Sequence, residues 1–254
     1  MNYPNENLST TQSDANLKYS GTQYLLTAED DLKNYNNWIV STFLRNVEIS
    51  KETRVMDFGA GIGTLSEIFY RITGVKPDCV EVDSAQRNLI EKRGFKAYSS
   101  LGEVKGKYDL IFTSNVLEHI EDDVDALSDL KSKLDNSGLI TIFVPAFEMI
   151  WTSNDELVGH YRRYEKKPMS IKLERSGFAV KNIQYCDSIG FLLSFIFKYV
   201  GSKNGGASST SLRVFDRILL PISKVMDILV LRKFGKSLLA IAISNEATSE
   251  RLSV

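Results

Sequence analysis

The sequence predicts an α/β fold in which helices cover both faces of a parallel sheet. Between about residues 30 and 145, short β-branched apolar runs alternate with segments whose apolar residues recur at helical spacing. The strand-like runs are apolar throughout rather than alternating, which is typical of strands that are buried on both faces. Such alternation favours parallel strands joined by helical crossovers.

Each element of this region can be assigned in order. Strands are expected at residues 54–60, 78–83, 95–99, 108–115 and 139–146. Helices are expected at residues 29–47, 63–73, 84–94 and 122–138. The last two helical segments end in glycine, a residue that readily adopts the left-handed conformation found at helix C-termini.

The pattern changes after Pro145. It predicts a helix at 167–178, a strand at 178–186, a mobile glycine- and serine-rich loop at 201–210, a mostly helical stretch at 212–234 and a closing strand at 237–245. The apolar face expected along the helical stretch consists of Phe215, Ile218, Leu219, Ile222, Val225, Met226 and Leu229. We therefore expect a flexible polar tail at 1–28, one domain at 29–246 with a helical insert at 188–236, and a short tail at 247–254.

The bulk properties exclude several classes of protein. A formal net charge of −1 gives no electrostatic reason to expect a nucleic-acid partner. The two cysteines, Cys79 and Cys186, lack metal-ligand spacing and suit a reducing cytoplasm, and no metal site is expected. The polar N-terminus has no signal-peptide layout, and the apolar run at 189–200 is shorter than the roughly 20 residues that a membrane span needs. We expect a cytoplasmic protein without a transmembrane segment.

The strongest functional signal is VMDFGAGIGTLS, residues 55–66. A strand that ends in Gly59, Gly61 and Gly63 and continues into a helix brings bare backbone close to a ligand, because a side chain would block that approach. Asp83 lies 20 residues after Gly63 (83 − 63 = 20), at the expected end of the next strand. A carboxylate there can accept hydrogen bonds from a ribose diol, so the pattern indicates an adenosine-containing cofactor.

Two residues distinguish between the candidate cofactors. A dinucleotide-binding loop has glycine or alanine where this chain has Thr64. Asp57, two residues before the first glycine, would repel a pyrophosphate but attract an ammonium or a sulfonium. S-adenosylmethionine carries both cations and no phosphate.

The segments DFGAGIGTLS, VEVDS and YDLIFTSNVLEHIEDD together resemble the motifs of class I S-adenosylmethionine-dependent methyltransferases, in particular the type 11/12 group. The resemblance covers about residues 30–186. It implies a Rossmann-like, seven-stranded, mostly parallel sheet with one antiparallel strand, and a helical insert before the last strand. The acidic and apolar pair that often binds adenine after the third strand is replaced here by Ser99-Ser100-Leu101.

The resemblance also implies the residues that contact the cofactor. Asp57 and residues 59–61 would line the methionine moiety, Asp83 would hold the ribose, and Asn115 and Leu117 would lie near the sulfonium. The complete expected set is Tyr35, Asp57, Gly59, Ala60, Gly61, Gly63, Asp83, Ser84, Ser100, Asn115, Val116 and Leu117.

A second unusual segment, NDELVGHYRRYEKK at residues 154–167, follows the fifth strand and resembles a D-E-x-x-G-H-x-R-R-Y pattern found in a subset of the same group. Ligands of open α/β sheets lie beyond the C-terminal ends of the strands, so this segment can form a lid over the substrate. The candidate catalytic residues are His119, His160, Tyr161, Arg162, Arg163 and Tyr164. His160 would accept or orient a proton, the arginines would hold anionic or carbonyl groups, and the tyrosines would form walls. The alternative is structural: an arginine pairs with Asp155 or Glu156 and the tyrosines pack.

We therefore expect an S-adenosylmethionine-dependent methyltransferase that acts in line on an O or N acceptor. The acceptor would be a small molecule or a lipid- or sugar-linked intermediate, with a protein lysine as the alternative. A non-catalytic cofactor-binding partner protein and an NAD-dependent oxidoreductase are the alternatives from other classes. The insert at 188–236 is expected to cover the core or form a homodimer interface, or else to form an apolar substrate tunnel or a membrane-surface contact.

Overall fold

The computed structural model describes residues 12–45, 47–200 and 208–244. Most of the loop expected at 201–210, the first part of the expected N-terminal tail and the C-terminal tail lie outside the described residues. The strands are β1 (Val55–Phe58), β2 (Asp78–Val80), β3 (Lys96–Tyr98), β4 (Tyr108–Ser114), β5 (Leu134–Pro145), β6 (Phe178–Cys186) and β7 (Ser237–Ser244).

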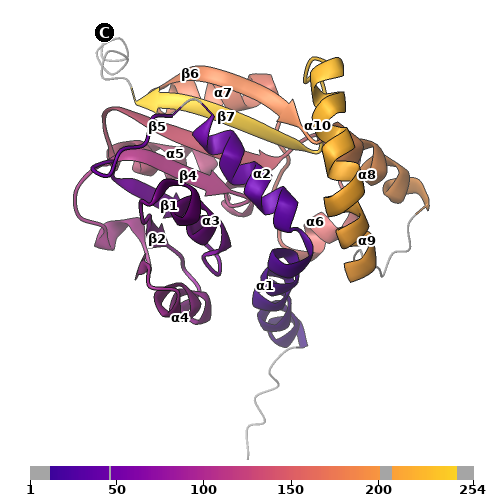
Figure 1. The fold of residues 1–254 in the computed structure, drawn as a ribbon, viewed down its shortest axis with the longest axis horizontal. Coiled ribbons are helices and arrows are strands. Elements are labelled where there is room, and N and C mark those ends of the chain that lie inside the picture. Colours follow the sequence, from indigo (N-terminus) through magenta and orange to yellow (C-terminus); the bar gives the residue numbers. More distant parts are fainter. Residues whose placement is uncertain (1–11, 46, 201–207, 245–254) are drawn as a thin grey trace, which may run out of the picture.

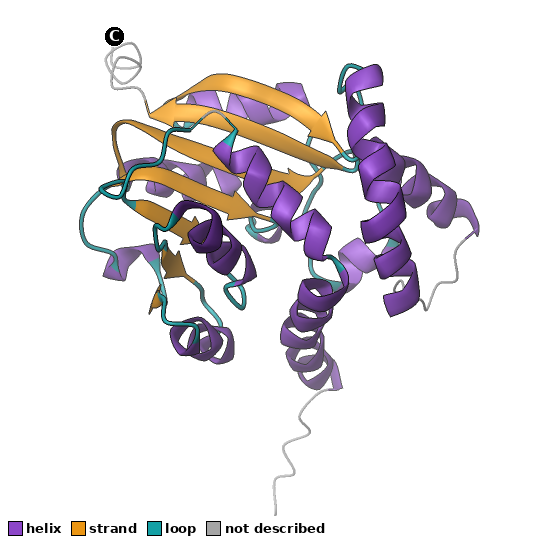
Figure 2. Ribbon diagram, viewed as in Figure 1, coloured by secondary structure: helices purple, strands orange, loops and turns teal. Residues whose placement is uncertain are grey.

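The seven strands form one sheet in the order β3-β2-β1-β4-β5-β7-β6. The first five pair in parallel, and β7 runs antiparallel to both β5 and β6. The expected mostly parallel seven-stranded sheet with one antiparallel strand is thus confirmed. Figures 1 and 2 show helices on both sides of this twisted sheet.

The helices before β6 connect the strands and cover the sheet. They are α1 (Gln12–Asp31), α2 (Lys33–Leu44), α3 (Thr64–Thr73), α4 (Ser84–Lys92), α5 (Asp123–Ser132), α6 (Ser153–Leu157) and α7 (Lys166–Arg175), with the 3-10 turns η1 (Leu101–Glu103), η2 (Leu117–His119) and η3 (Glu148–Ile150). Side chains alternate along the buried strands, so Leu110 and Phe112 pack against α2 and α3 while Ile111 packs towards α5 and α7. Both faces of the central strands are therefore core, as their continuous apolar sequences predict.

The N-terminal region departs from the expected flexible tail at 1–28, because residues 12–31 form helix α1. Glu29 near the end of this helix is bound in a two-pronged ion pair by Arg93, which follows α4, with nitrogen–oxygen distances of 2.6 and 2.8 Å. This pair holds the end of α1 against α4 and close to the loop between β1 and α3.

The expected helical insert lies between β6 and β7 and stands at one end of the sheet (Figure 1). It contains α8 (Ser188–Val200), α9 (Ser209–Val214), the π-helical turn η4 (Phe215–Leu219) and α10 (Leu220–Leu229). Among the described residues, no helix combines the length and the apolar character needed to cross a membrane.

The insert buries Asp216, Leu220, Ser223 and Asp227, whereas four residues of the predicted apolar face, Ile218, Ile222, Val225 and Leu229, are exposed. Asp216 accepts hydrogen bonds from the backbone N–H groups of Asn34 and Tyr35 at the start of α2, at 3.0 and 2.7 Å. Asp227 accepts from the N–H groups of Asp187 and Ser188 at the start of α8. The inward carboxylates thus satisfy helix N-termini. The exposed side of the insert includes Ile218, Ile222, Val225, Ile228 and Leu229. Its use as a dimer, membrane or substrate contact stays a prediction.

Candidate active site

The glycine loop joins β1 to α3 and is built against the ends of the neighbouring strands. The backbone at Gly59 has a φ of +74°, and its N–H donates to the carbonyl of Val80 at 2.8 Å. A Cβ atom at this position would lie 2.2 Å from a methyl carbon of Val116, in the loop after β4. Both the positive φ and the close contact require glycine here. The two loops therefore meet directly.

The carboxylate that faces this loop is Glu81, the residue that follows β2. Its Oε2 accepts from the N–H of Gly61 at 2.9 Å, and its Oε1 accepts from the N–H of Asp83 at 2.9 Å. Gly61 and Glu81 are 20 residues apart in sequence. The side chain of Asp83 instead caps α4 by accepting from the N–H groups of Ala85 and Gln86. Strand β2 ends at Val80, three residues before the end expected from the sequence (83 − 80 = 3), and the loop-facing position falls to Glu81.

Asp57 lies beneath the loop rather than on its surface. Its side chain is buried and accepts a hydrogen bond from the hydroxyl of Ser66, in α3, at 2.7 Å. Burial raises the Asp57 pKa to about 7, and the neighbouring charge of Glu81 acts in the same direction. Contact of Asp57 with a cationic part of the cofactor stays a prediction.

The residues after β4 form the second side of the same edge. Asn115 is exposed and adopts a φ of +54°, a conformation that asparagine tolerates better than most residues. Val116 is half-buried against Gly59, and Leu117 is fully buried in the core. The segment 115–117 therefore lies next to the glycine loop, as the predicted cofactor contacts require.

Three of the predicted cofactor residues are either exposed to solvent (Ser84 and Ser100) or packed in an aromatic cluster (Tyr35). Ser84 and Ser100 are exposed, at the starts of α4 and η1. Tyr35 packs in an aromatic cluster with Trp38 and Phe143, at centroid distances of 5.5 and 6.4 Å. Its pKa is raised by burial. The structure gives Tyr35 a packing role, and its contact with a cofactor stays a prediction.

Residues 147–164, which we call the post-β5 segment, leave the end of β5 and return to it. Ala146 pairs with Tyr164 in an isolated parallel bridge, and Phe147 starts the segment with a φ of +60°. The N–H of Tyr161 donates to the carbonyl of Glu118 at 2.7 Å. These contacts place the segment over the loop after β4, on the side of the sheet where the glycine loop lies.

Asp155 is the centre of this segment. It is 1% exposed, and its oxygens accept from Nε and Nη2 of Arg163, each at 2.9 Å. They also bind Nδ1 of His160 at 2.8 Å and the N–H and hydroxyl of Thr152. Burial alone would raise the Asp155 pKa, but the hydrogen bonds from His160 and Arg163 hold it well below its usual range.

Two further residues of the predicted lid, Arg162 and Tyr164, are bound to other parts of the protein, and their contact with a substrate stays a prediction. Arg162 donates to the carbonyls of Ile120 and Glu121 and lies 3.0 Å from a carboxylate oxygen of Asp123. The buried Tyr164 donates its hydroxyl to the same carboxylate at 2.8 Å. Burial and Asp123 raise the Tyr164 pKa. Arg162 and Arg163 are thus both ion-paired, whereas the structural alternative expected an ion pair for one of them. Tyr161 is exposed to solvent.

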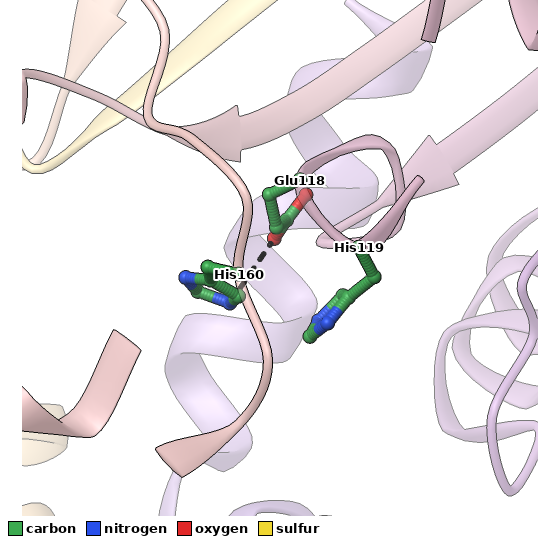
Figure 3. A group of neighbouring side chains, drawn as sticks. All are labelled: Glu118, His119 and His160. Atoms are coloured by element: carbon green, nitrogen blue, oxygen red, sulfur yellow. Dashed lines mark ion pairs between the residues drawn. The ribbon is translucent and has the colours of Figure 1, made fainter. Parts of the chain in front are cut away.

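The two histidines meet at this edge although they are 41 residues apart in sequence (160 − 119 = 41). Their rings are 4.6 Å apart, centroid to centroid, and nearly perpendicular. Burial, together with His160, lowers the pKa of His119. The side chain of Glu118 lies beside the two rings and is fully buried, with Oε1 3.9 Å from Nε2 of His160 (Figure 3). Burial raises the Glu118 pKa to about 8.

Glu81, Glu118 and Asp123 were not among the predicted site residues. Glu118 and Asp123 stand within the quoted segment YDLIFTSNVLEHIEDD, and Glu81 within VEVDS, so the sequence contained each of them. Which acid of each segment points inward depends on where the strand ends, and the sequence pattern fixes that only to within a few residues.

Two hollows in the surface lie away from these residues. One, of about 360 Å³, is bordered by Arg54 and Tyr108 at the N-terminal ends of β1 and β4, away from the glycine loop. The other, of about 560 Å³, lies between Trp38 of α2 and Lys224 of α10. Neither contains the glycine loop or the histidines. We place the candidate site by its chemistry, which gathers at the C-terminal edge of the strands where ligands of such sheets bind.

Residues 31–180, more than half of the chain, match the family described as "Methyltransferase domain". The chain belongs to this family of methyltransferase domains. No curated protein matches the chain in sequence.

Solved structures share its fold. Phosphoethanolamine N-methyltransferase 2 of Haemonchus contortus, in complex with S-adenosyl-L-methionine, has a TM-score of 0.62 at 14% identity, with 94% of this chain and 61% of that chain covered. An S-adenosylmethionine-dependent methyltransferase of Archaeoglobus fulgidus has a TM-score of 0.55 at 20% identity, covering 87% and 99%. One of Mesorhizobium loti has a TM-score of 0.55 at 14% identity, covering 82% and 97%. At these identities the likeness establishes the fold.

Proposed function

We propose that this protein is an S-adenosylmethionine-dependent methyltransferase. The observation that carries the proposal is the meeting of three features at one edge of the sheet: the glycine loop, the carboxylate of Glu81 and the histidine pair after β4 and β5. The family match and the cofactor bound to the Haemonchus contortus enzyme support it.

Glu81 is the residue that we assign to the ribose. A carboxylate offers about four acceptor sites, and the bonds from Gly61 and Asp83 use one on each oxygen. Each oxygen therefore keeps a site for one hydroxyl of a diol. The methionine moiety would lie along residues 59–61 and 115–117. This assignment replaces the ribose role that the sequence gives to Asp83, whose carboxylate is used by the N-terminus of α4.

In methyl transfer the protein mainly has to position the acceptor in line with the methyl–sulfur bond. The lone pair of the acceptor attacks the methyl carbon, and the carbon–sulfur bond breaks with its electrons passing to sulfur, which leaves a neutral thioether. A hydroxyl or ammonium acceptor also has to lose a proton. The proposal gives the role of proton acceptor to His119 or His160, and the lowered pKa of His119 favours the neutral imidazole that this role requires.

We further propose an O or N acceptor on a small molecule or on a lipid- or sugar-linked intermediate. The N-methyltransferase named above supports a nitrogen acceptor by analogy of fold alone. A protein lysine is the second candidate. The exposed Tyr161 and the exposed apolar side of the insert are the surfaces that would meet a larger acceptor.

Calorimetry with S-adenosylhomocysteine tests the cofactor assignment. We expect saturable binding, and we expect Glu81→Gln to weaken it by about 10- to 100-fold, the value of a hydrogen bond to a charged group. Asp83→Asn is the matched control, because asparagine caps helices as well as aspartate does. Tighter binding of NAD than of S-adenosylhomocysteine would contradict the proposed function, and weakening by Asp83→Asn alone would return the ribose to Asp83.

A further inference from the structure

Glu118 presents a structural problem that the proposed methyl transfer does not explain. Its side chain is fully buried, yet neither carboxylate oxygen has a hydrogen-bond partner among the described residues. A buried polar group without a partner costs about 1–3 kcal/mol, and more when the group is charged. Both Glu118 oxygens are therefore free to contact a ligand that the protein side chains do not supply.

The neighbouring nitrogen atoms are arranged to share such a ligand. Nδ1 of His160 is used by Asp155 at 2.8 Å, which leaves Nε2 directed at Glu118, 3.9 Å from its Oε1. His119 supplies a second imidazole, and one ligand atom from each of the three residues lies within 4.8 Å of the others. Figure 3 shows the three side chains around a common space.

We propose that Glu118, His119 and His160 bind a divalent transition-metal ion of the zinc class. Two imidazoles and one carboxylate form a ligand set that zinc takes up while keeping a fourth position open. Magnesium and calcium prefer oxygen ligands and suit the site less well. No metal site was expected from the sequence, because the proposed ligands come from two segments that only the fold brings together.

The distances allow this coordination after small side-chain movements. Tetrahedral zinc with bonds of about 2.0–2.1 Å holds its ligand atoms roughly 3.3–3.4 Å apart. The separation of 3.9 Å between His160 and Glu118 therefore has to shorten by about half an ångström. His119 is exposed on η2 and can rotate to close the remaining gap.

Asp155 has the position of the outer carboxylate that supports many metal-bound histidines. By accepting from Nδ1 it fixes the tautomer of His160 with a free Nε2, and Arg163 holds the carboxylate in turn through two hydrogen bonds of 2.9 Å. The imidazole is thus oriented towards Glu118 before any ion arrives. If the proposed methyltransferase function is correct, the open fourth position would bind an oxygen or nitrogen atom of the acceptor. With the ion bound, the ion rather than a histidine would favour loss of the acceptor's proton.

Metal binding can be measured without an acceptor. We would titrate untagged protein with Zn²⁺ by calorimetry and with Co²⁺ by visible absorption, since the chain's only two histidines are both in the site. The expected result is one equivalent bound with the absorption of tetrahedral cobalt. His160→Ala and Glu118→Gln should weaken binding by at least about 100-fold, and Asp155→Asn by about 10- to 100-fold.

Glu156→Gln is the control variant, because Glu156 is an exposed carboxylate on α6, the helix that carries Asp155. It should bind as the wild type does, and so should the double variant Cys79→Ser, Cys186→Ser. Circular dichroism reports whether each variant is folded. Absence of one-to-one binding, or equal affinity in folded His160→Ala, would overturn the proposal. S-adenosylhomocysteine binding in the same samples tests the proposed function separately.

Discussion

Replacing Arg163 by alanine would leave a buried carboxylate without its counter-charge. The Arg163 side chain is 7% exposed and that of Asp155 is 1% exposed, and two parallel hydrogen bonds of 2.9 Å join them. Paired geometry of this kind offsets the cost of removing both charges from water. In Arg163→Ala the Asp155 carboxylate is still removed from water, but the two hydrogen bonds from Arg163 that offset this cost are lost.

The expected loss can be estimated from buried pairs in general. Removing one partner of a buried ion pair costs about 3–5 kcal/mol. For a chain of this length each kcal/mol lowers the melting temperature by about 2–4 °C, so Arg163→Ala should melt roughly 6–20 °C below the wild type. Arg54 provides the comparison, because it pairs with Asp135 at 2.6 Å while 49% exposed. Arg54→Ala should cost only about 0–1 kcal/mol.

Urea denaturation at pH 7, followed by circular dichroism, measures both variants against the wild type. The comparison uses the midpoint and slope of each transition, so that a change in the unfolded state is recognised. Equal losses in Arg163→Ala and Arg54→Ala would refute the reasoning, because burial would then not set the cost of breaking the pair.

Three further predictions concern the same edge of the sheet. Arg162→Ala should cost only about 1–2 kcal/mol in urea denaturation, because its side chain is 24% exposed and Lys172 remains 2.6 Å from the shared Asp123; a loss as large as that of Arg163→Ala would contradict this. The buried Asp57 has a pKa raised from 3.8 to about 7 in the folded protein, so the folded state keeps a proton that the unfolded state has lost between these values. The wild type should therefore lose up to about 1.4 kcal/mol of stability per pH unit relative to Asp57→Asn as the pH rises from 5 to 7, and parallel stability curves would contradict this. On the proposed function, His160→Ala should lower turnover by about 100-fold or more while S-adenosylhomocysteine affinity, measured by calorimetry, changes little; equal losses in both would make His160 a cofactor residue.

Much of the fold could be predicted because its signals are local. The strand at 178–186 and the closing strand at 237–245 agree with β6 and β7 to within one residue. The positive φ angles at Gly59, Gly61 and Gly63 agree with the glycine pattern from which the loop was predicted. These features depend on neighbours in sequence, so periodicity and glycine placement are sufficient to predict them.

The candidate site was predictable only in part. The two histidines and the segment 154–167 were identified, but the sequence left open which arginine pairs with which acid. Helix α10 shows the same limit. Together with the preceding turn η4 it carries an apolar stripe in sequence, yet Asp216 of η4 and Asp227 of α10 turn inward because they satisfy the N-termini of α2 and α8.

The sequence by itself determined the α/β class, the glycine loop and the family resemblance, because each is written in residues that are close together along the chain. Only the tertiary structure decided that Glu81 rather than Asp83 faces the loop, and that Glu118, His119 and His160 share one space. The physical reason is that side-chain direction depends on where a strand ends and on long-range contacts. Strand β2 ends at Val80, so Glu81 accepts from the N–H of Gly61 while Asp83 caps α4, and these contacts join segments that are distant or irregular in sequence.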